Sequence, residues 1–181
     1  RCEYPVVDGV PVIVPDVRAY VAGNILPIIA RGDLGEATES LLGDCCGPGS
    51  SYDVLRQHLS TYAFDHYGDL DPAEDCDPPY PPGAALKLLA EGLATAGSEV
   101  PSGPVLDAGC SVGRTSFALA EARDGLVLGV DLNFGMLRLA SRVLREGVVR
   151  SPRRRVGIVY DRREFTVKMA GAERVDFWAC D

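Results

Sequence analysis

Short apolar runs alternate with amphipathic segments in the second half of the chain. Residues 104–106 and 126–130 have strand length, and the segment between them has helical spacing. Residues 134–147 have their apolar side chains on one helical face, and Asn133 before them is a favourable N-cap. The apolar run at residues 175–180 is the third predicted strand. This alternation predicts an α/β fold with parallel strands in the order 3-2-1.

An insertion interrupts this alternation at residues 151–171. The β-rich runs 156–160 and 165–169 flank four polar residues, 161–164, so the pattern predicts an inserted β-hairpin with its turn at those polar residues. Three consecutive arginines, 153–155, precede it. They could grip an anionic substrate, but we interpret them as a solvated surface.

The first half of the chain predicts a different organisation. Two β-rich runs flank Asp8-Gly9 and indicate a tight hairpin that must pack on another element. The remaining segments predict helices at 17–42 (broken at Gly32-Asp33), 52–67 and 84–96, a loop at 44–51, and an irregular connector at 68–83. In the helix at 52–67 we expect the core-facing stripe to be Leu55, Leu59, Tyr62 and Phe64. The predicted units are therefore a hairpin (1–16), a helical cap and connector (17–100) and an α/β domain (101–181).

Composition narrows the classes of function. The formal charge of −8 over 181 residues argues against a surface that coats nucleic acid, so we favour a small-molecule substrate. The sequence contains no apolar run of about 20 residues that could span a bilayer. We expect a cytoplasmic protein without a membrane partner.

The six cysteines have no regular spacing and include no C-x2-C pair. A vicinal pair, Cys45-Cys46, could in principle ligate zinc with Cys2 and Cys76. We instead interpret the cysteines as reduced, small packing residues, and we predict no metal site.

A glycine-rich turn carries the chemical signal. Asp107 ends the first α/β strand, and Gly109, Ser111 and Gly113 follow at alternate positions. Glycines at such a turn let a ligand approach the backbone and leave free N–H groups at a helix start. The dinucleotide pattern G-x-G-x-x-G would place its second and third glycines at Ser111 and Arg114, so it fits poorly.

Aspartates also end the other two strands of this domain, at positions 131 and 181. Ligands of open α/β sheets bind at the carboxyl ends of the strands. Asp131 could accept hydrogen bonds from ribose hydroxyls, which would suit either S-adenosylmethionine (SAM) or NAD. Together with Asp107, these acids indicate a nucleotide-type ligand at one edge of the sheet.

The pattern Asp107-x-Gly109-x-Ser111-x-Gly113 resembles the first motif of class I SAM-dependent methyltransferases, with serine at its middle glycine. The resemblance spans residues 103–181 and implies a Rossmann-like, doubly wound sheet of which strands 3-2-1 are present. It implies that Gly109, Cys110, Ser111 and Gly113 pass under the methionine part of the cofactor. It further implies that Asp107 helps hold the amino group, Asp131 the ribose, Leu132 the adenine face and Asp181 the adenine edge.

Two shorter resemblances refine this expectation. Residues 2–16 resemble the last third of zinc-ribbon-like domains related to tRNA-methyltransferase activators, although the upstream cysteines are missing. Residues 110–117, with His66-Tyr67-Gly68, resemble the methyltransferase domain of mercaptohistidine synthesis, which implies that the helix carrying Tyr62, His66 and Tyr67 caps the cofactor.

The resemblance implies no catalytic residue, because in this family a general base usually follows the fourth strand. Cys110 beside a helix N-terminus could be a nucleophile, but we expect it to pack under the sheet. We also expect the protein to continue past Asp181, since the first strand would otherwise be an unprotected edge. Two alternatives remain, an NAD(P)-dependent oxidoreductase and a non-catalytic methyltransferase-fold adaptor.

Overall fold

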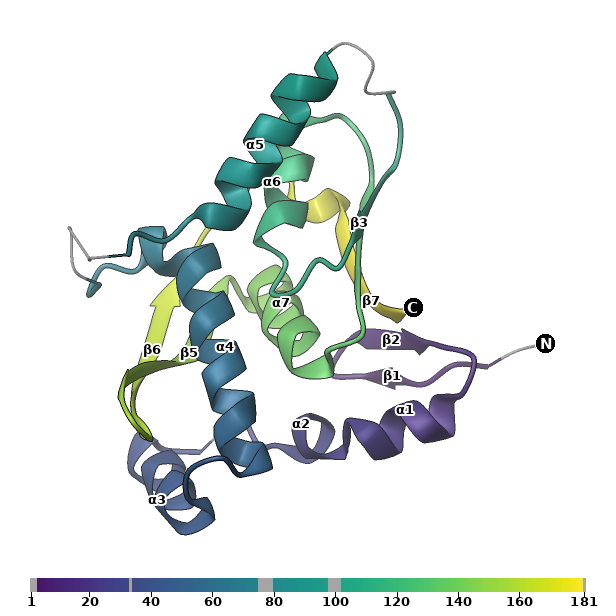
Figure 1. Ribbon diagram of the computed structural model, residues 1–181. Helices are drawn as coiled ribbons and strands as arrows, with labels where there is room; N and C mark the ends of the chain where they lie inside the picture. The colour runs from purple at the N-terminus through teal and green to yellow at the C-terminus, as the bar shows by residue number, and fades with distance from the viewer. Residues whose placement is uncertain (1–2, 33, 75–79, 98–101, 181) are drawn as a thin grey trace.

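The computed structural model describes residues 3–32, 34–74, 80–97 and 102–180. They form a mixed α/β structure around a mostly parallel sheet in the order β1-β2-β7-β4-β3 (Figure 1). In that order its strands span Val6–Val7, Val10–Ile13, Val175–Cys180, Val127–Asp131 and Val105–Ala108. No helix in these ranges is both long and apolar enough to cross a membrane.

The three strands β3, β4 and β7 run parallel, which confirms the predicted order 3-2-1. Helix α6 (Arg114–Ala122) connects β3 to β4, and helix α7 (Phe134–Glu146) follows β4. Both helices pack on the same face of the sheet, and Figure 1 shows them to one side of β3 and β7. As predicted, Asn133 caps α7, because its side-chain oxygen accepts a hydrogen bond from the Met136 N–H at 3.3 Å.

The core of this layer is built around the Phe177 ring of β7. Phe177 is fully buried and meets Phe117 of α6 edge-on, with ring centroids 5.5 Å apart. Gly129 and Gly113 make room for it, since a Cβ on either would lie within 2.8 Å of this ring. A Cβ on Gly113 would also lie 2.8 Å from the Ala140 Cβ of α7. These two glycines therefore let the helices pack closely on the strands.

The opposite face of the sheet is only partly covered. Leu106 of β3 points away from α6 and is 63% exposed. Helices α6 and α7 both lie on the other face. The second helical layer of the expected doubly wound sheet is therefore absent among the described residues. The outer edge of β3 likewise has no strand partner within these ranges.

The N-terminal hairpin forms as predicted and joins the main sheet. Asp8 and Gly9 have φ values of 49° and 80°, which suit a two-residue turn between β1 and β2. Strand β2 then pairs parallel with β7, with Val12 opposite Ala179. Val10 and Val12 are fully buried in the common core. The hairpin, expected as a unit of its own, therefore extends the edge of the α/β sheet.

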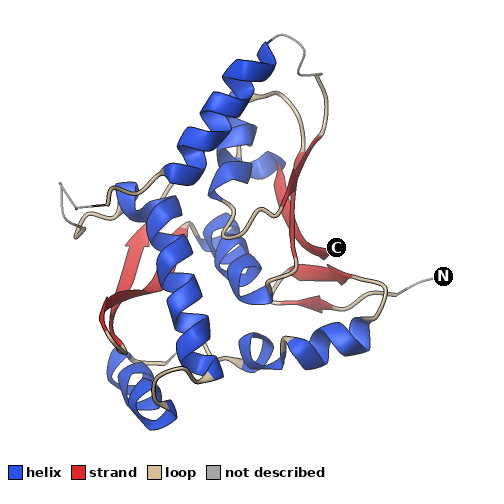
Figure 2. Cartoon of the chain, in the orientation of Figure 1, coloured by secondary structure: helices blue, strands red, loops and turns tan. Residues whose placement is uncertain are grey.

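The helical region has more breaks than expected. The helices before β3 are α1 (Val17–Gly23), α2 (Ile25–Ile29), α3 (Glu36–Cys46), α4 (Ser51–Tyr67) and α5 (Ala84–Ala96), with a 3-10 turn, η1, at Gly68–Leu70 (Figure 2). Helix α5 has the predicted bounds. The stripe predicted on α4 is only partly right: Leu59 packs against the core, whereas Tyr62 is 45% exposed. The buried face of α4 instead carries Asp53, Arg56, Ser60, Ala63, His66 and Tyr67.

The inserted hairpin is present, but its turn was predicted in the wrong place. Strand β5 (Val148–Val156) pairs with β6 (Val159–Thr166), so the chain turns at Gly157 and Ile158. The polar residues 161–164 lie in β6, where neighbouring elements satisfy their charges. Arg163, for example, donates two hydrogen bonds of 2.7 Å to the carboxylate of Asp71.

The arginine run 153–155 is only partly a solvated surface. Arg154 and Arg155 are exposed. Arg153 instead binds both carboxylate oxygens of Glu74, at 2.9 and 3.2 Å, and its guanidinium stacks 3.6 Å from the Phe64 ring centroid. Arg153 therefore ties β5 to α4 and to the connector after η1. A short 3-10 turn, η3 (Ala172–Arg174), leads from the hairpin into β7.

The slot for Phe177 is tested by Gly113→Ala. Gly113 has a φ of +86° and no space for a Cβ, so we expect this variant to lose about 2 to 4 kcal/mol of unfolding free energy in urea. The matched control is Gly92→Ala on α5, where a Cβ meets nothing within 4 Å. It should gain about 0.5 to 1 kcal/mol from helix propensity. Equal stability of the two variants would contradict the packing described above.

Candidate functional site

The glycine turn lies between β3 and α6, at the carboxyl edge of the parallel strands. Gly109, Ser111 and Gly113 all have positive φ values, of 79°, 53° and 86°. The N–H groups of Gly109 and Cys110 both donate to the Val130 carbonyl, at 2.8 and 3.0 Å. A Cβ added to Gly109 would meet nothing within 4 Å, so the space above this residue is open.

Asp131, at the end of β4, binds the neighbouring turn. One carboxylate oxygen accepts the Ser111 N–H at 2.9 Å, and the other accepts the Asn133 N–H at 2.7 Å. This carboxylate therefore joins the turn after β3 to the turn after β4. It holds Ser111 in its left-handed conformation, which a residue with a Cβ adopts only at a cost in free energy. Each oxygen keeps acceptor capacity for a further donor.

Asp107, the last acid of β3, faces the start of α6. The hydroxyls of Thr115 and Ser116 both donate to its Oδ2 at 2.7 Å. Ser116 is fully buried, whereas Asp107 is half-buried. These bonds fix the Asp107 side chain beside the first turn of α6.

Leu132 follows Asp131 and presents an apolar side chain at the same edge. It is 50% exposed, whereas its carbonyl accepts the Tyr20 hydroxyl of α1 at 3.0 Å. Burial, together with the nearby charge of Asp131, raises the pKa of Tyr20 to about 12. The Tyr20 phenol is therefore a neutral donor that positions the backbone at Leu132.

The C-terminal end of α4 lies against the glycine turn. Tyr67 is fully buried and donates a hydrogen bond from its hydroxyl to the Val112 carbonyl at 2.7 Å. Arg114, at the start of α6, lies over the Tyr67 ring at 5.8 Å and forms a 3.2 Å ion pair with Asp69. Helix α4 thus contacts the glycine turn through Tyr67, which binds the Val112 carbonyl and lies under the Arg114 guanidinium.

Two buried polar atoms in this region have no hydrogen-bond partner among the described residues. They are Nδ1 of His66 and the hydroxyl of Ser111. Burial lowers the pKa of His66, and the Arg114 charge lowers it further, while Asp65 and Asp107 raise it. The imidazole is therefore neutral at pH 7. Unsatisfied buried atoms of this kind are common at ligand sites, because a ligand supplies the missing partner.

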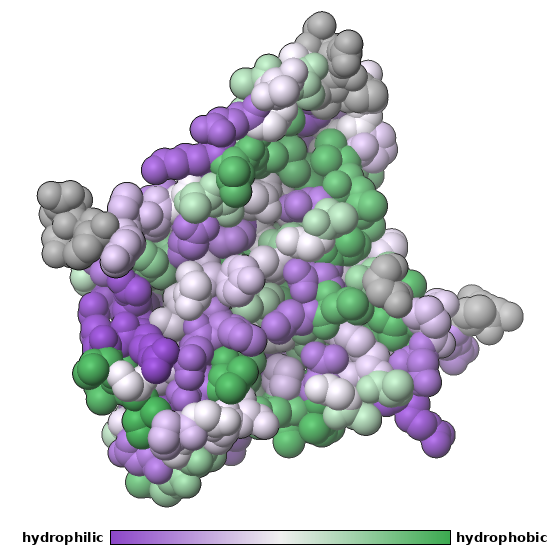
Figure 3. Space-filling view, viewed as in Figure 1, coloured by the Kyte–Doolittle hydropathy of each residue, from purple (hydrophilic) through white to green (hydrophobic). Residues whose placement is uncertain are grey.

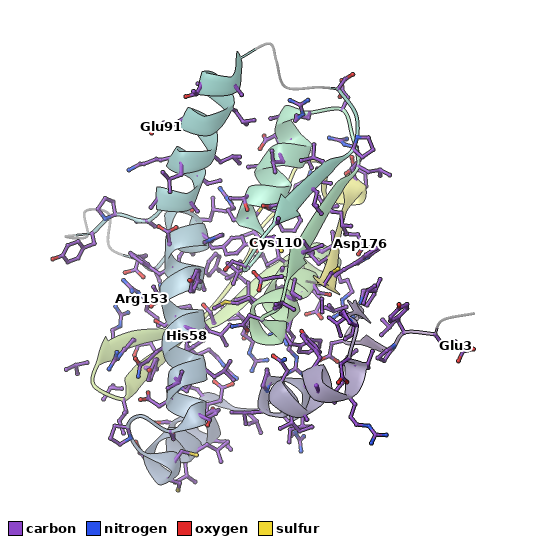
Figure 4. All side chains as sticks on the ribbon, turned by 45° about the vertical axis from the view of Figure 1, so that its right-hand side comes forward. Glu3, His58, Glu91, Cys110, Arg153 and Asp176 are labelled. Carbon is purple, nitrogen blue, oxygen red and sulfur yellow. The ribbon has the colours of Figure 1, made fainter. Side chains whose placement is uncertain are left out.

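Cys110 packs inside the molecule, as expected. Its side chain is 1% exposed, and Figure 4 shows the residue between the helical layer and the sheet. Burial raises the pKa of its thiol well above the usual range, and Asp107 and Asp131 raise it further. The thiol therefore stays protonated and is a poor nucleophile.

Several sequence-based expectations concern residues outside the described ranges. Asp181, the expected adenine-edge acid, is one, and the cysteines at positions 2 and 76 are two others. Cys45 and Cys46 are exposed at the end of α3. No group of three or more His, Cys, Asp or Glu side chains that could hold a metal ion occurs in the described part of the chain.

Comparison with protein-family models and with curated proteins gave no match for this chain.

The structure brings most of the expected site residues together. Gly109, Cys110, Ser111, Gly113, Asp131 and Leu132 lie on two adjacent turns, and Asp107 lies directly below them at the end of β3. Sequence reasoning missed Tyr20, because its partner Leu132 is 112 positions away. It also missed the hydroxyls on Asp107, although Thr115 and Ser116 directly follow the motif.

The contact between α4 and the turn is tested by Tyr67→Phe. This change leaves the buried Val112 carbonyl without its donor, so we expect a loss of about 1 to 3 kcal/mol in unfolding free energy. Tyr62→Phe on the exposed side of the same helix is the control and should lie within about 0.5 kcal/mol of the parent. Similar losses in both variants would show that the Tyr67 hydroxyl adds no stability.

The neutral state of His66 predicts an acid-sensitive stability. Its folded pKa lies below the unfolded value of 6.5, so the unfolded chain takes up a proton first as the pH falls. The contribution of the neutral His66 to the free energy of unfolding is therefore full above about pH 6.5 and falls as the pH drops below it. In urea titrations between about pH 7 and about pH 5.5, His66→Gln should flatten this slope. An unchanged slope in His66→Gln would disprove the assignment.

Proposed function

We propose that this chain is a SAM-dependent methyltransferase with a Rossmann-like class I methyltransferase fold, and that the glycine turn binds the cofactor. The support comes from the position of one glycine. In dinucleotide-binding folds the third glycine of G-x-G-x-x-G permits close helix–strand packing. That position is Arg114 here, and its side chain points to Tyr67 and Asp69, away from the sheet.

The close packing is instead provided by Gly113, one residue earlier. It has no room for a Cβ between Phe177 and Ala140. The turn is therefore built on the spacing Gly109-x-Ser111-x-Gly113, which resembles the SAM motif. This shift by one residue favours SAM over NAD(P) as the ligand.

The residues around the turn suit this cofactor. The open space above Gly109 and the unpaired Ser111 hydroxyl would adjoin its methionine part. Asp131 would accept the ribose hydroxyls with its remaining lone pairs. The half-exposed Leu132 side chain would cover one face of the adenine. Asp107, already holding two hydroxyls through Oδ2, would direct its other oxygen to the amino group.

When bound, the cofactor supplies an activated methyl group on a sulfonium, which carries its own leaving group. The contribution of this chain is then binding, orientation and exclusion of water. The buried Tyr67 and His66 would shield the turn on the α4 side. Cys110 has no part as a nucleophile in this proposal, because its thiol stays protonated.

We favour a small-molecule methyl acceptor. The net charge of −8 gives the protein an unfavourable field for nucleic acid. The resemblance of residues 110–117 and His66-Tyr67-Gly68 to mercaptohistidine methyltransferase domains makes a mercaptohistidine-like acceptor a specific candidate. An NAD(P) oxidoreductase and a non-catalytic adaptor are outcomes of the following test.

Calorimetric titration with S-adenosylhomocysteine, SAM and NADH tests the proposal. We expect micromolar binding of the first two and none of NADH. Leu132→Ala should weaken S-adenosylhomocysteine about fivefold or more without loss of stability, because this side chain is already half-exposed. Asp131→Ala should abolish binding.

Asp124→Ala is the matched control for Asp131→Ala, since Asp124 is an exposed aspartate outside the turn. It should bind S-adenosylhomocysteine like the parent. Binding of NADH alone would replace the proposal by an oxidoreductase, whereas no binding of any of the three ligands would favour the adaptor.

A further inference from the structure

A second hollow lies on the side of α7 that faces away from the sheet. This cavity, of about 160 Å³, is lined by residues of α2, α3, α4, α7 and the β5–β6 hairpin. Helix α7 contributes Gly135, Arg138 and Arg142, which form a stripe opposite Ala140, the residue that packs beside the glycine turn. The cavity is therefore separate from the proposed cofactor site.

Arginines dominate its charged lining. Among the described residues, six arginines face it, together with three carboxylates, Glu36, Glu39 and Asp161; the arginines are Arg31, Arg56, Arg138, Arg142, Arg150 and Arg162. The whole chain has 16 arginines and a net charge of −8. This positive excess is thus a local feature in an acidic protein. Figure 3 shows strongly hydrophilic residues gathered beside it, over the β5–β6 hairpin at the left edge.

Several of these arginines have structural partners. Arg162 forms a 2.8 Å ion pair with Glu39, and Arg138 forms one of 2.7 Å with Asp8. Arg150 donates to the carbonyls of Gly32 and Leu34 on the chain between α2 and α3. These contacts assemble the walls of the cavity from distant parts of the sequence.

Arg56 of α4 differs from them. It is only 8% exposed, yet it forms no hydrogen bond or ion pair with any described residue. Its guanidinium lies 3.9 Å from the ring centroid of Tyr160 and 5.5 Å from that of Tyr52. The neighbouring helix α3 makes room for it at Gly43, where a Cβ would lie 2.0 Å from the guanidinium.

The nearby buried carboxylate of Asp53 does not bind Arg56. It accepts hydrogen bonds from the Gly49 N–H, the Gln57 amide and the Tyr160 hydroxyl, all between 2.8 and 2.9 Å. A buried guanidinium without an anionic partner is costly. Its five donors would be satisfied by an anion in the cavity.

Arg142 is a second cation with unused donors at this cavity. Among the residues that the structure describes, its one ion pair is to Glu146, at a distance of 3.8 Å. Burial lowers the pKa of Arg142, and although Glu146 opposes this, the charges of Arg150 and Arg138 lower it further. A bound anion would therefore stabilise the charged form of the Arg142 guanidinium.

We infer that this cavity binds a small anion whose phosphate or carboxylate group meets Arg56 and Arg142 and whose ring-sized apolar part lies on Leu55, Leu59 and Pro27. These three apolar residues line the same hollow. A cavity of roughly 150 Å³ accommodates a benzene ring. Arginine is the residue best suited to bidentate recognition of phosphate or carboxylate.

Phenyl phosphate, benzoate, inorganic phosphate and the neutral phenol are the probes for calorimetry on the full chain. We expect phenyl phosphate or benzoate to bind with a Kd of about 1 mM or lower and phenol not to bind. Arg56→Met keeps the side-chain length and removes the charge, so it should weaken the anion about tenfold or more. Arg56→Lys should restore part of the affinity.

Arg18→Met is the control. Arg18 is exposed on α1 and does not line the cavity, so its loss should leave anion binding unchanged. If Arg56→Met does not fold, Arg142→Met replaces it, since that side chain is 21% exposed and leaves no buried void. Absence of anion binding by the parent protein, or equal binding by the Arg56 and Arg18 variants, would overturn the inference.

Inorganic phosphate that binds as tightly as phenyl phosphate would refute the apolar subsite. S-adenosylhomocysteine binding should be unchanged in Arg56→Met. The tests of the anion site and of the cofactor site are therefore independent, and a negative result for one proposal leaves the other standing.

Discussion

Helices α6 and α7 pack closely on the sheet around the ring of Phe177, and this packing positions the glycine turn and its neighbours. Gly113 and Gly129 leave the space that this ring fills, so α6 and α7 can pack around it close to the strands. Because Gly113 is also the last residue of the glycine turn, the same packing fixes where the turn lies. Asp131 then joins that turn to the end of β4. Core packing and the geometry of the candidate site therefore have one origin.

Helix α4 connects the two candidate sites through its polar buried face. At its C-terminal end Tyr67 supports the glycine turn, and near its N-terminal end Arg56 faces the arginine-lined cavity. Between them, the Ser60 hydroxyl accepts the backbone N–H of Arg154 from the hairpin at 2.8 Å. A helix with an ordinary apolar inner stripe could pack here but could not make these bonds. The buried polar residues of α4 thus organise the layer that covers α7.

The regular part of the fold could be predicted from the sequence, because its elements bury an apolar face in the common core. This holds for the helices at 84–96 and 134–147 and for the strands on either side of α6. The inner face of α4 could not be predicted, since its partner is a polar hairpin and not a sheet. The predicted position of the hairpin turn was also wrong, because the polar residues of β6 bind partners such as Asp71 and Glu39 on distant elements.

The candidate site was predictable to the same extent. The residues of the turn lie close in sequence, and parallel strands bring their ends together. Tyr20 and Arg56 act through partners about a hundred positions away, and no local pattern marks such contacts. The absence of a second helical layer among the described residues could not be predicted either, since the motif residues all belong to the layer formed by α6 and α7.

Nitrogen-15 NMR titration with S-adenosylhomocysteine identifies the backbone amides that the ligand touches. We expect saturable shifts at Gly109, Ser111, Gly113 and Leu132, with NADH causing none. Arg56 and its neighbours should stay unshifted. Shifts confined to other residues, or shifts at the turn with NADH alone, would contradict the assignment of this turn to SAM.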